Sequence, residues 1–103
     1  MSHPSKVKGN AFEREVVDAA KAIGLEAKRA WGSNGLSIGC DPEVDLVIEG
    51  EHVQAKRRKA LPAYLQIPTC CDAVVFRQDR KSALVLLRLD DYLSILQELK
   101  QKG

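Results

Sequence analysis

VDLVIEGEHVQAKRR, residues 44–58, decides the fold, because it reads as two short apolar strands with Gly50 at the turn between them. The strands are expected over residues 44–48 and 52–57. A two-residue turn at Gly50 and Glu51 places Asp45 opposite Lys56, because the residue numbers of two paired positions in an antiparallel hairpin always add up to the same value. By the same sum, Val47 faces Gln54.

The two faces of this hairpin differ in chemistry, because side chains alternate along a strand. One face carries an acid, an amide and an amine: Asp45, Gln54 and Lys56. The other face is expected to belong to the core and carries Leu46, Ile48, Val53 and Ala55. The polar face runs into a continuous basic stretch, residues 56–59.

The rest of the chain supplies helices and further strands around this hairpin. An apolar stripe predicts a helix from residue 11, with Gly24 as its stop, and a short strand follows over residues 25–31. Residues 31–43 are rich in glycine and serine and predict a long irregular segment. Later elements are expected at residues 60–68 (short helix), 72–77 and 83–89 (strands) and 91–102 (helix).

This order, αβββ(α)ββα, predicts an α/β fold with a central mixed β-sheet flanked by helices. Residues 1–9 are polar and predict a flexible basic N-terminal arm, while residues 10–103 are expected to form one domain. The last helix is expected to begin at a cap, Asp90, and to turn four side chains inward: Tyr92, Leu93, Leu96 and Leu99.

Composition limits the setting and the partners. The chain has 103 residues, 45% of them hydrophobic, and no apolar stretch long enough to span a bilayer, so no membrane partner is expected. Three cysteines without metal-ligand spacing favour a reducing, cytoplasmic location, and Cys70 and Cys71 are expected to pack as small hydrophobes. The net charge is only +2, so evidence for an acidic partner has to come from clusters of basic residues.

The polar hairpin face resembles the core of the PD-(D/E)XK nuclease superfamily, with an acid on one strand and polar-x-Lys on the next. Upstream, GNAFEREVV (residues 9–17) resembles the first-helix motif of archaeal-type Holliday junction resolvases. WGSNG (residues 31–35) is similar to the glycine and serine loop of that family. The resemblance covers residues 8 to about 77 and implies a restriction-endonuclease-like core.

The resemblance implies a catalytic set and a metal. The catalytic residues would be Glu13, Ser33, Asp45, Gln54 and Lys56, with Ser33 close to the reactive centre. Mg²⁺, or Mn²⁺ in its place, would be held by oxygens of Glu13, Asp45, Gln54 and the carbonyl of Ala55. Lys56 would steady the charge that develops on the phosphate.

The implied substrate is DNA, in the form of a four-way junction. Two symmetric scissile phosphates in such a junction imply a two-fold homodimer. Phosphate contacts are expected from the basic residues Lys6, Lys8, Lys28, Arg29, Arg57, Arg58 and Lys59. A further cluster, Arg77 with Arg80 and Lys81, receives no role from the resemblance.

Two positions depart from the family pattern: Gln54 stands where an acid is usual, and Val44 replaces a proline. An uncharged ligand binds Mg²⁺ less tightly, and Asp41 or Glu43 are candidates for the missing charge. Three alternatives therefore stay open. The chain is another nuclease of the superfamily that acts on ends, nicks or flaps, a catalytically silent DNA-binding module, or a purely structural partner-binding domain.

Several of these residues also have an ordinary structural explanation that needs no catalytic role. Glu13 in a first helical turn is also favoured by the helix dipole, and Ser33 suits a turn. Lys56 begins a charge run of the kind that usually forms a solvated face, and His52 is expected to face solvent.

Overall fold

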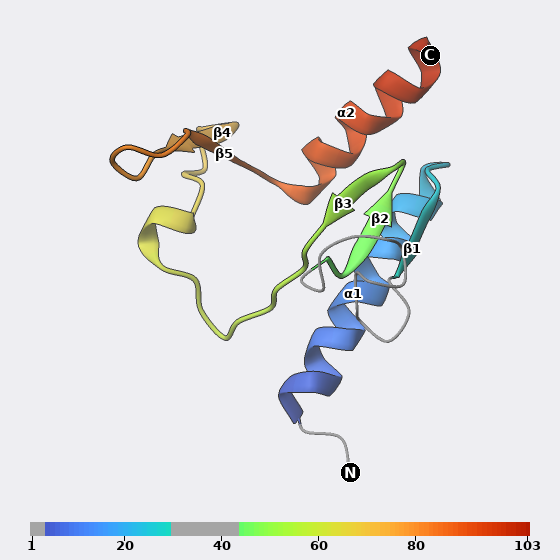
Figure 1. The fold of residues 1–103 in the computed structure, drawn as a ribbon, viewed down its shortest axis with the longest axis horizontal. Coiled ribbons are helices and arrows are strands. Elements are labelled where there is room, and N and C mark those ends of the chain that lie inside the picture. The colour runs from blue at the N-terminus through green and yellow to red at the C-terminus, as the bar shows by residue number, and fades with distance from the viewer. Residues whose placement is uncertain (1–3, 30–43) are drawn as a thin grey trace. The chain divides into compact units, whose positions relative to one another are not determined.

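The computed structural model describes residues 4–29 and 44–103, and it shows the predicted order of elements in a small α/β protein (Figure 1). The described chain falls into two compact units, one on each side of the junction between residues 57 and 58. The first unit contains a helix and a three-stranded sheet, and the second contains a two-stranded sheet and the C-terminal helix.

The first helix, α1 (Pro4–Ala22), buries the stripe that the periodicity predicts, with Val16, Val17 and Ala20 at most 6% exposed. Gly24 ends it as expected. Its φ of 88° is left-handed, its N–H donates to the carbonyl of Lys21 (3.0 Å), and the N–H of Leu25 donates to the carbonyl of Ala20 (3.0 Å). This pair of bonds is a Schellman motif, which uses glycine because it has no Cβ.

The helix begins earlier than the apolar stripe predicts. Residues 4–9, expected to lie in an irregular arm, form the first turns of α1. Proline fits the first position of a helix, because its missing N–H would have no intrahelical partner there. Periodicity marks only the part of a helix that packs, so it places the start too late.

The sheet of the first unit has the strand order β1-β2-β3, with both pairs antiparallel. Its strands are β1 (Ala27–Arg29), β2 (Leu46–Ile48) and β3 (Glu51–Val53). It packs on α1 through β1 and β2 (Figure 1), and Leu46 and Ile48 are completely buried. The expected core face is thus confirmed for β2, while Val53 and Ala55 are half-buried.

The turn of the hairpin lies one residue earlier than expected. Glu49 (φ 49°) and Gly50 (φ 81°) both have positive φ, as a type I′ turn requires, and Ile48 pairs with Glu51. The expected pairing of Asp45 with Lys56 and of Val47 with Gln54 is therefore wrong, and Val47 pairs with His52. The pairing is therefore shifted by two residues relative to the expected one. Because side chains alternate between the faces with a period of two, this shift leaves each side chain on the same face, and the division into an apolar and a polar face is preserved.

The second unit starts with a single 3-10 turn, η3 (Ala63–Leu65), where a short helix over residues 60–68 was expected. Two antiparallel strands follow, β4 (Ala73–Phe76) and β5 (Leu84–Leu87), and the chain closes with α2 (Leu89–Lys102). Arg88 donates to the carbonyls of Cys71 (2.9 Å) and Pro68 (3.3 Å) and so ties the turn before β4 to the end of β5.

Three details of this unit correct the predictions. The N-cap of α2 is Arg88, without a side-chain hydrogen bond, and Asp90 lies inside the first turn, where it suits the helix dipole. Leu93 and Leu96 are buried as expected, but Leu99 is 61% exposed because it lies in the last turn. Cys70 and Cys71 are exposed free thiols in the turn tied by Arg88, not core residues.

The expected single mixed sheet is also not observed. Every strand pair in the described part of the chain is antiparallel, and the strands form two sheets, of three and two strands. Among the described helices, none is both long enough and apolar enough to cross a membrane.

Candidate functional site

Asp45 holds the hairpin on both sides of Gln54. Its backbone N–H donates to the carbonyl of Val53 (3.0 Å), and its Oδ2 accepts a hydrogen bond from the N–H of Ala55 (2.9 Å). Val53 already pairs with Leu46, so two residues of one strand face one residue of the other, as in a β-bulge. Bulges re-aim side chains, and here the carboxylate takes the place of a backbone acceptor just beyond the end of β3.

Next to this anchored carboxylate, the predicted polar residues of the second arm are accessible. Gln54 and Lys56 are exposed, while Asp45 and Ala55 are half-buried. Asp45 therefore lies beside the Gln-Ala-Lys segment, even though the register differs from the expected one. The basic residues that follow, Arg57, Arg58 and Lys59, are exposed as well.

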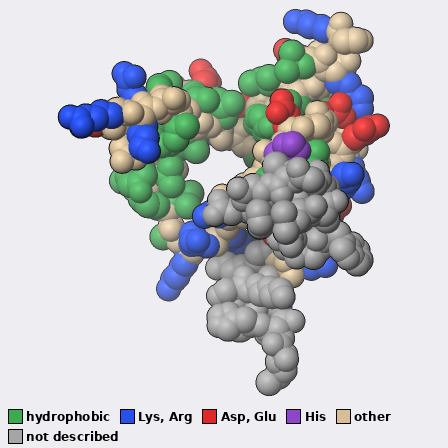
Figure 2. All heavy atoms as spheres, in the orientation of Figure 1, with side chains coloured by type: hydrophobic (Ala, Val, Ile, Leu, Met, Phe, Trp, Pro, Cys, Tyr) green, Lys and Arg blue, Asp and Glu red, His purple; other side chains and the backbone are tan. Residues whose placement is uncertain are grey.

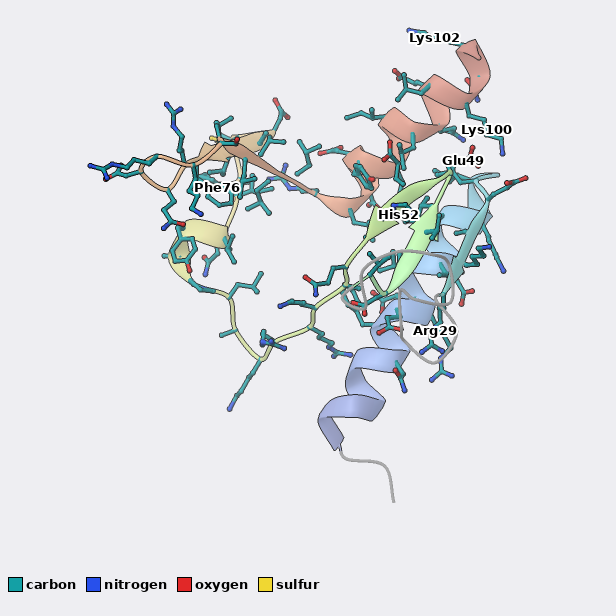
Figure 3. All side chains as sticks on the ribbon, in the orientation of Figure 1. Arg29, Glu49, His52, Phe76, Lys100 and Lys102 are labelled. Atoms are coloured by element: carbon teal, nitrogen blue, oxygen red, sulfur yellow. The ribbon has the colours of Figure 1, made fainter. Side chains whose placement is uncertain are left out.

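Glu13 is buried in α1, 6% exposed, and is held by Arg29. Arg29 belongs to β1 and is labelled in Figure 3. Nε of Arg29 donates to Oε1 of Glu13 at 3.0 Å, and Nη2 donates to Oδ1 of Asn10 at 3.2 Å. A buried carboxylate needs a compensating charge, and the planar guanidinium provides it while it also satisfies the amide one turn earlier on the helix. Arg29 therefore joins the sheet to the helix.

These two anchored acids lie at the same end of the sheet. Arg29 is paired with Leu46, and Asp45 is the residue directly before Leu46. The opposite end of the sheet holds the turn, where Oε2 of Glu49 accepts a hydrogen bond from the N–H of Glu26 (2.6 Å). The structure thus gathers Glu13, Arg29, Asp45 and Ala55 at the end of the sheet that is away from the turn.

The oxygen atoms near Asp45 determine how well a hard cation such as Mg²⁺ could bind at this end of the sheet. The carboxylate of Asp45, the amide oxygen of Gln54 and the carbonyl of Ala55 are oxygens of the kind that Mg²⁺ prefers, and the hydrogen bond from the N–H of Ala55 brings Asp45 to the segment that carries the other two. Glu13 fits less well, because Arg29 already neutralises it. Within the described ranges, no group of three or more His, Cys, Asp or Glu side chains is placed to hold a metal. The set suits Mg²⁺ by atom type and lacks negative charge.

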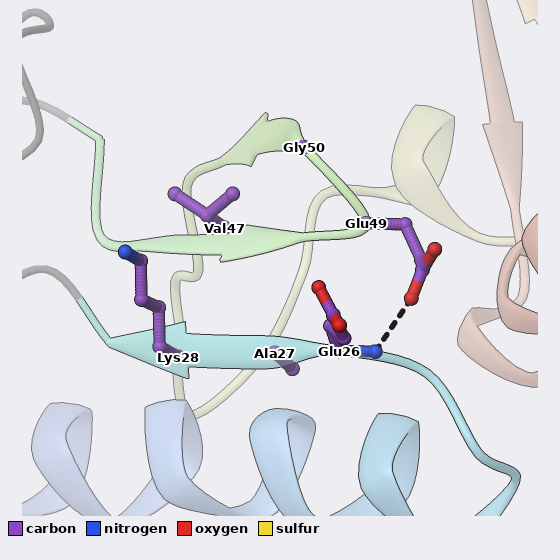
Figure 4. Close-up of a pocket in the computed structure, with 6 residues that line it drawn as sticks. All are labelled: Glu26, Ala27, Lys28, Val47, Glu49 and Gly50. Atoms are coloured by element: carbon purple, nitrogen blue, oxygen red, sulfur yellow. Dashed lines mark hydrogen bonds between the residues drawn. The ribbon is translucent and has the colours of Figure 1, made fainter.

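A hollow of about 310 Å³ lies at the turn end of the same sheet (Figure 4). It is lined by Glu26, Ala27, Lys28, Val47, Glu49 and Gly50. Lys28 belongs to the predicted DNA-contacting set, but none of the predicted catalytic residues lines this hollow. We therefore place the candidate site at Asp45 and not in the hollow.

Several predicted residues have no described environment. Ser33, the WGSNG segment around it, Asp41 and Glu43 lie outside the described residues. Lys6 and Lys8 lie in the first turns of α1, where the structure gives the backbone only. Lys28 is exposed on β1 opposite Val47.

The sequence prediction missed what Arg29 does. Arg29 was expected to contact phosphates, whereas it binds Glu13 and Asn10 within the chain. One signal in the sequence was available: Glu13 lies on the same helical stripe as Val16, Val17 and Ala20, and a carboxylate on a buried stripe requires a cation from another element.

In comparisons with known proteins, the chain matches no protein-family model, no curated protein and no solved structure.

Proposed function

We propose that this chain is a metal-dependent, structure-selective DNA endonuclease that hydrolyses phosphodiester bonds and resolves four-way junctions. The observation that carries the proposal is the hydrogen bond of 2.9 Å between the N–H of Ala55 and Oδ2 of Asp45. It joins the acid of one strand to the Gln-Ala-Lys segment of the next, which is the constellation that resembles PD-(D/E)XK nucleases. A restriction-endonuclease-like core is part of the proposal.

Each residue of this constellation has a distinct task. Asp45, Gln54 and the carbonyl of Ala55 would hold Mg²⁺ or Mn²⁺, with Glu13 as a further carboxylate once it separates from Arg29. The chemistry that such a cation supplies is polarisation of a phosphate oxygen and activation of water for attack at phosphorus. Lys56, exposed and two residues after Gln54, neutralises charge that develops on the phosphate. Ser33 is assigned a position near the reactive centre on the resemblance alone.

The partner is DNA, and the basic residues after β3 favour this choice. Arg57, Arg58 and Lys59 are exposed and follow the catalytic segment directly, so they are suited to phosphates on either side of the scissile bond. Cleavage at two symmetric positions of a junction requires two copies of the site, so the working unit is a two-fold homodimer in the cytoplasm.

A second function is favoured by two specific observations. Gln54 brings no negative charge, and the carboxylate of Glu13 is paired with Arg29. A site with one uncommitted carboxylate holds Mg²⁺ weakly, and the chain would then be a catalytically silent module that binds branched DNA.

The deciding experiment is cleavage of a labelled four-way junction and a matched linear duplex with Mg²⁺ or Mn²⁺. We compare the wild type with Asp45→Ala, with Lys56→Ala and with Lys21→Ala, which removes the same charge from an exposed position in the last turn of α1. The proposal expects paired nicks near the branch point that disappear in the first two variants and persist in the third. Tight junction binding without cutting under either metal contradicts it and establishes the silent module.

A further inference from the structure

We propose that the loop between β4 and β5, residues 77–83, is a second DNA-contacting element that binds the phosphate backbone. The inference rests on the proposed function in one respect, the choice of DNA as the partner. The element lies entirely in the second unit, whereas the candidate site lies at Asp45 in the first.

The loop presents its charges from a defined scaffold. β4 and β5 pair over four positions, from Ala73 with Leu87 to Phe76 with Leu84, and the loop begins directly after this last pair. Three basic residues in the loop, Arg77, Arg80 and Lys81, are all exposed, against one acid, Asp79. Figure 2 shows Lys and Arg side chains gathered over this part of the chain.

The backbone of the loop is shaped by a tight turn with an unusual residue in it. The N–H of Lys81 donates to the carbonyl of Gln78 at 3.0 Å, and Arg80, inside this turn, has a φ of 65°. Glycine or asparagine would occupy a left-handed position at lower energy. The turn therefore sets an exposed arginine at a position where its backbone is less favourable than that of glycine or asparagine.

The three basic side chains are available to a partner. Across the described part of the chain, none of them takes part in an ion pair or a side-chain hydrogen bond. Three cations within five residues, with a single acid between them, repel one another. An external anion relieves this repulsion, and a chain of phosphates offers one such anion to each side chain.

The chemistry favours DNA phosphates over a lipid surface. Arginine binds phosphate through two parallel hydrogen bonds, and lysine adds a point charge to the same groups. Insertion into a membrane requires an apolar tip, but residues 77–82 are all polar or charged. The contact is to the backbone, so it raises affinity without selecting a base sequence.

The test is binding of the full chain to a fluorescent four-way junction in EDTA, measured by anisotropy across a series of salt concentrations. The variant Arg77→Gln/Arg80→Asn/Lys81→Gln removes three charges, and asparagine keeps the left-handed position accessible. The control variant Lys21→Gln/Lys100→Gln/Lys102→Gln removes three charges from the last turns of α1 and α2.

We expect the loop variant to make the negative slope of log K against log salt shallower by about 2 to 3, since each lost phosphate contact contributes about 0.9 to its magnitude. The control variant should make it shallower by less than about 1. Equal slopes for the two variants, or tighter binding to anionic vesicles than to DNA, overturn the inference. Thermal melts verify folding, and Arg77→Gln/Lys81→Gln, which leaves Arg80 in place, serves if the triple variant unfolds.

The outcome separates this inference from the proposed nuclease. Salt-dependent binding that needs the loop, together with an absence of cleavage under Mg²⁺ and Mn²⁺, keeps the inference and removes the nuclease. Cleavage that is lost in Asp45→Ala but unchanged in the loop variant keeps the nuclease and removes the inference.

Discussion

Asp45 accepts a hydrogen bond from the N–H of Ala55 at 2.9 Å, so the acid of one strand is fixed to the segment that carries Gln54 and Lys56. The same carboxylate serves two purposes in our proposal. It satisfies a backbone donor just beyond the end of β3, and it presents negative charge at a candidate metal site. These two purposes can be separated, because an amide can fulfil the first and not the second.

We predict that Asp45→Asn and Asp45→Ala differ in stability and agree in activity. The asparagine keeps an oxygen for the N–H of Ala55, so its free energy of unfolding should fall by less than about 0.5 kcal/mol, while alanine should cost about 1 to 2 kcal/mol. Both lose the charge, and cleavage should fall at least about a hundredfold. Urea unfolding and junction cleavage give the two readouts, and equal stability of the variants would show that the hydrogen bond does not support the hairpin.

Gln54→Glu is predicted to strengthen metal binding. A carboxylate at this exposed position adds a charged oxygen next to Asp45, and we expect the affinity for Mg²⁺ to rise on the order of tenfold, or about 1.4 kcal/mol. Calorimetry with Mg²⁺ measures it directly. Gln66→Glu, which adds the same charge in the second unit beside η3, is the control, and an equal gain in that variant would mean that net charge is responsible.

What the sequence predicted correctly here is local, and what it missed depends on contacts between distant residues. The helix stop at Gly24 and the buried Leu46 and Ile48 follow from a left-handed position and from strand alternation, both of which neighbouring residues determine. The link from Arg29 to Glu13 spans 16 positions, and nothing near Arg29 distinguishes an internal partner from a phosphate.

The register of the hairpin was missed for a more specific reason. A glycine can stand first in a type II′ turn or second in a type I′ turn, and these choices shift the pairing by two. The structure has Gly50 second, after Glu49. The hydrogen bond from the N–H of Glu26 to the Glu49 carboxylate holds that turn, and it comes from a residue 23 positions away.

Arg29 is predicted to stabilise the fold. Arg29→Ala leaves Glu13 buried without its cation, and we expect the free energy of unfolding to fall by about 2 kcal/mol. This is less than the roughly 3 to 5 kcal/mol typical of a fully buried pair, because the Arg29 side chain is 30% exposed. Arg29→Lys should cost about half as much, since one amine cannot reproduce the two directed bonds to Glu13 and Asn10. Unchanged stability together with weakened DNA binding would return Arg29 to the phosphate-contacting role that the sequence first indicated.

Gly50 offers the sharpest test of the observed turn. A Cβ built at this position meets no atom within 4 Å, so any effect of a substitution has to come from the φ of 81° and not from crowding. We expect Gly50→Ala to lower the free energy of unfolding by about 1 kcal/mol, and Gly50→Asn to lower it by clearly less, because asparagine tolerates the left-handed region. Urea unfolding of both variants checks this order. If alanine were neutral or stabilising, Gly50 would not be left-handed, and the pairing of Leu46 with Val53 that positions Asp45 beside Ala55 would have to be redrawn.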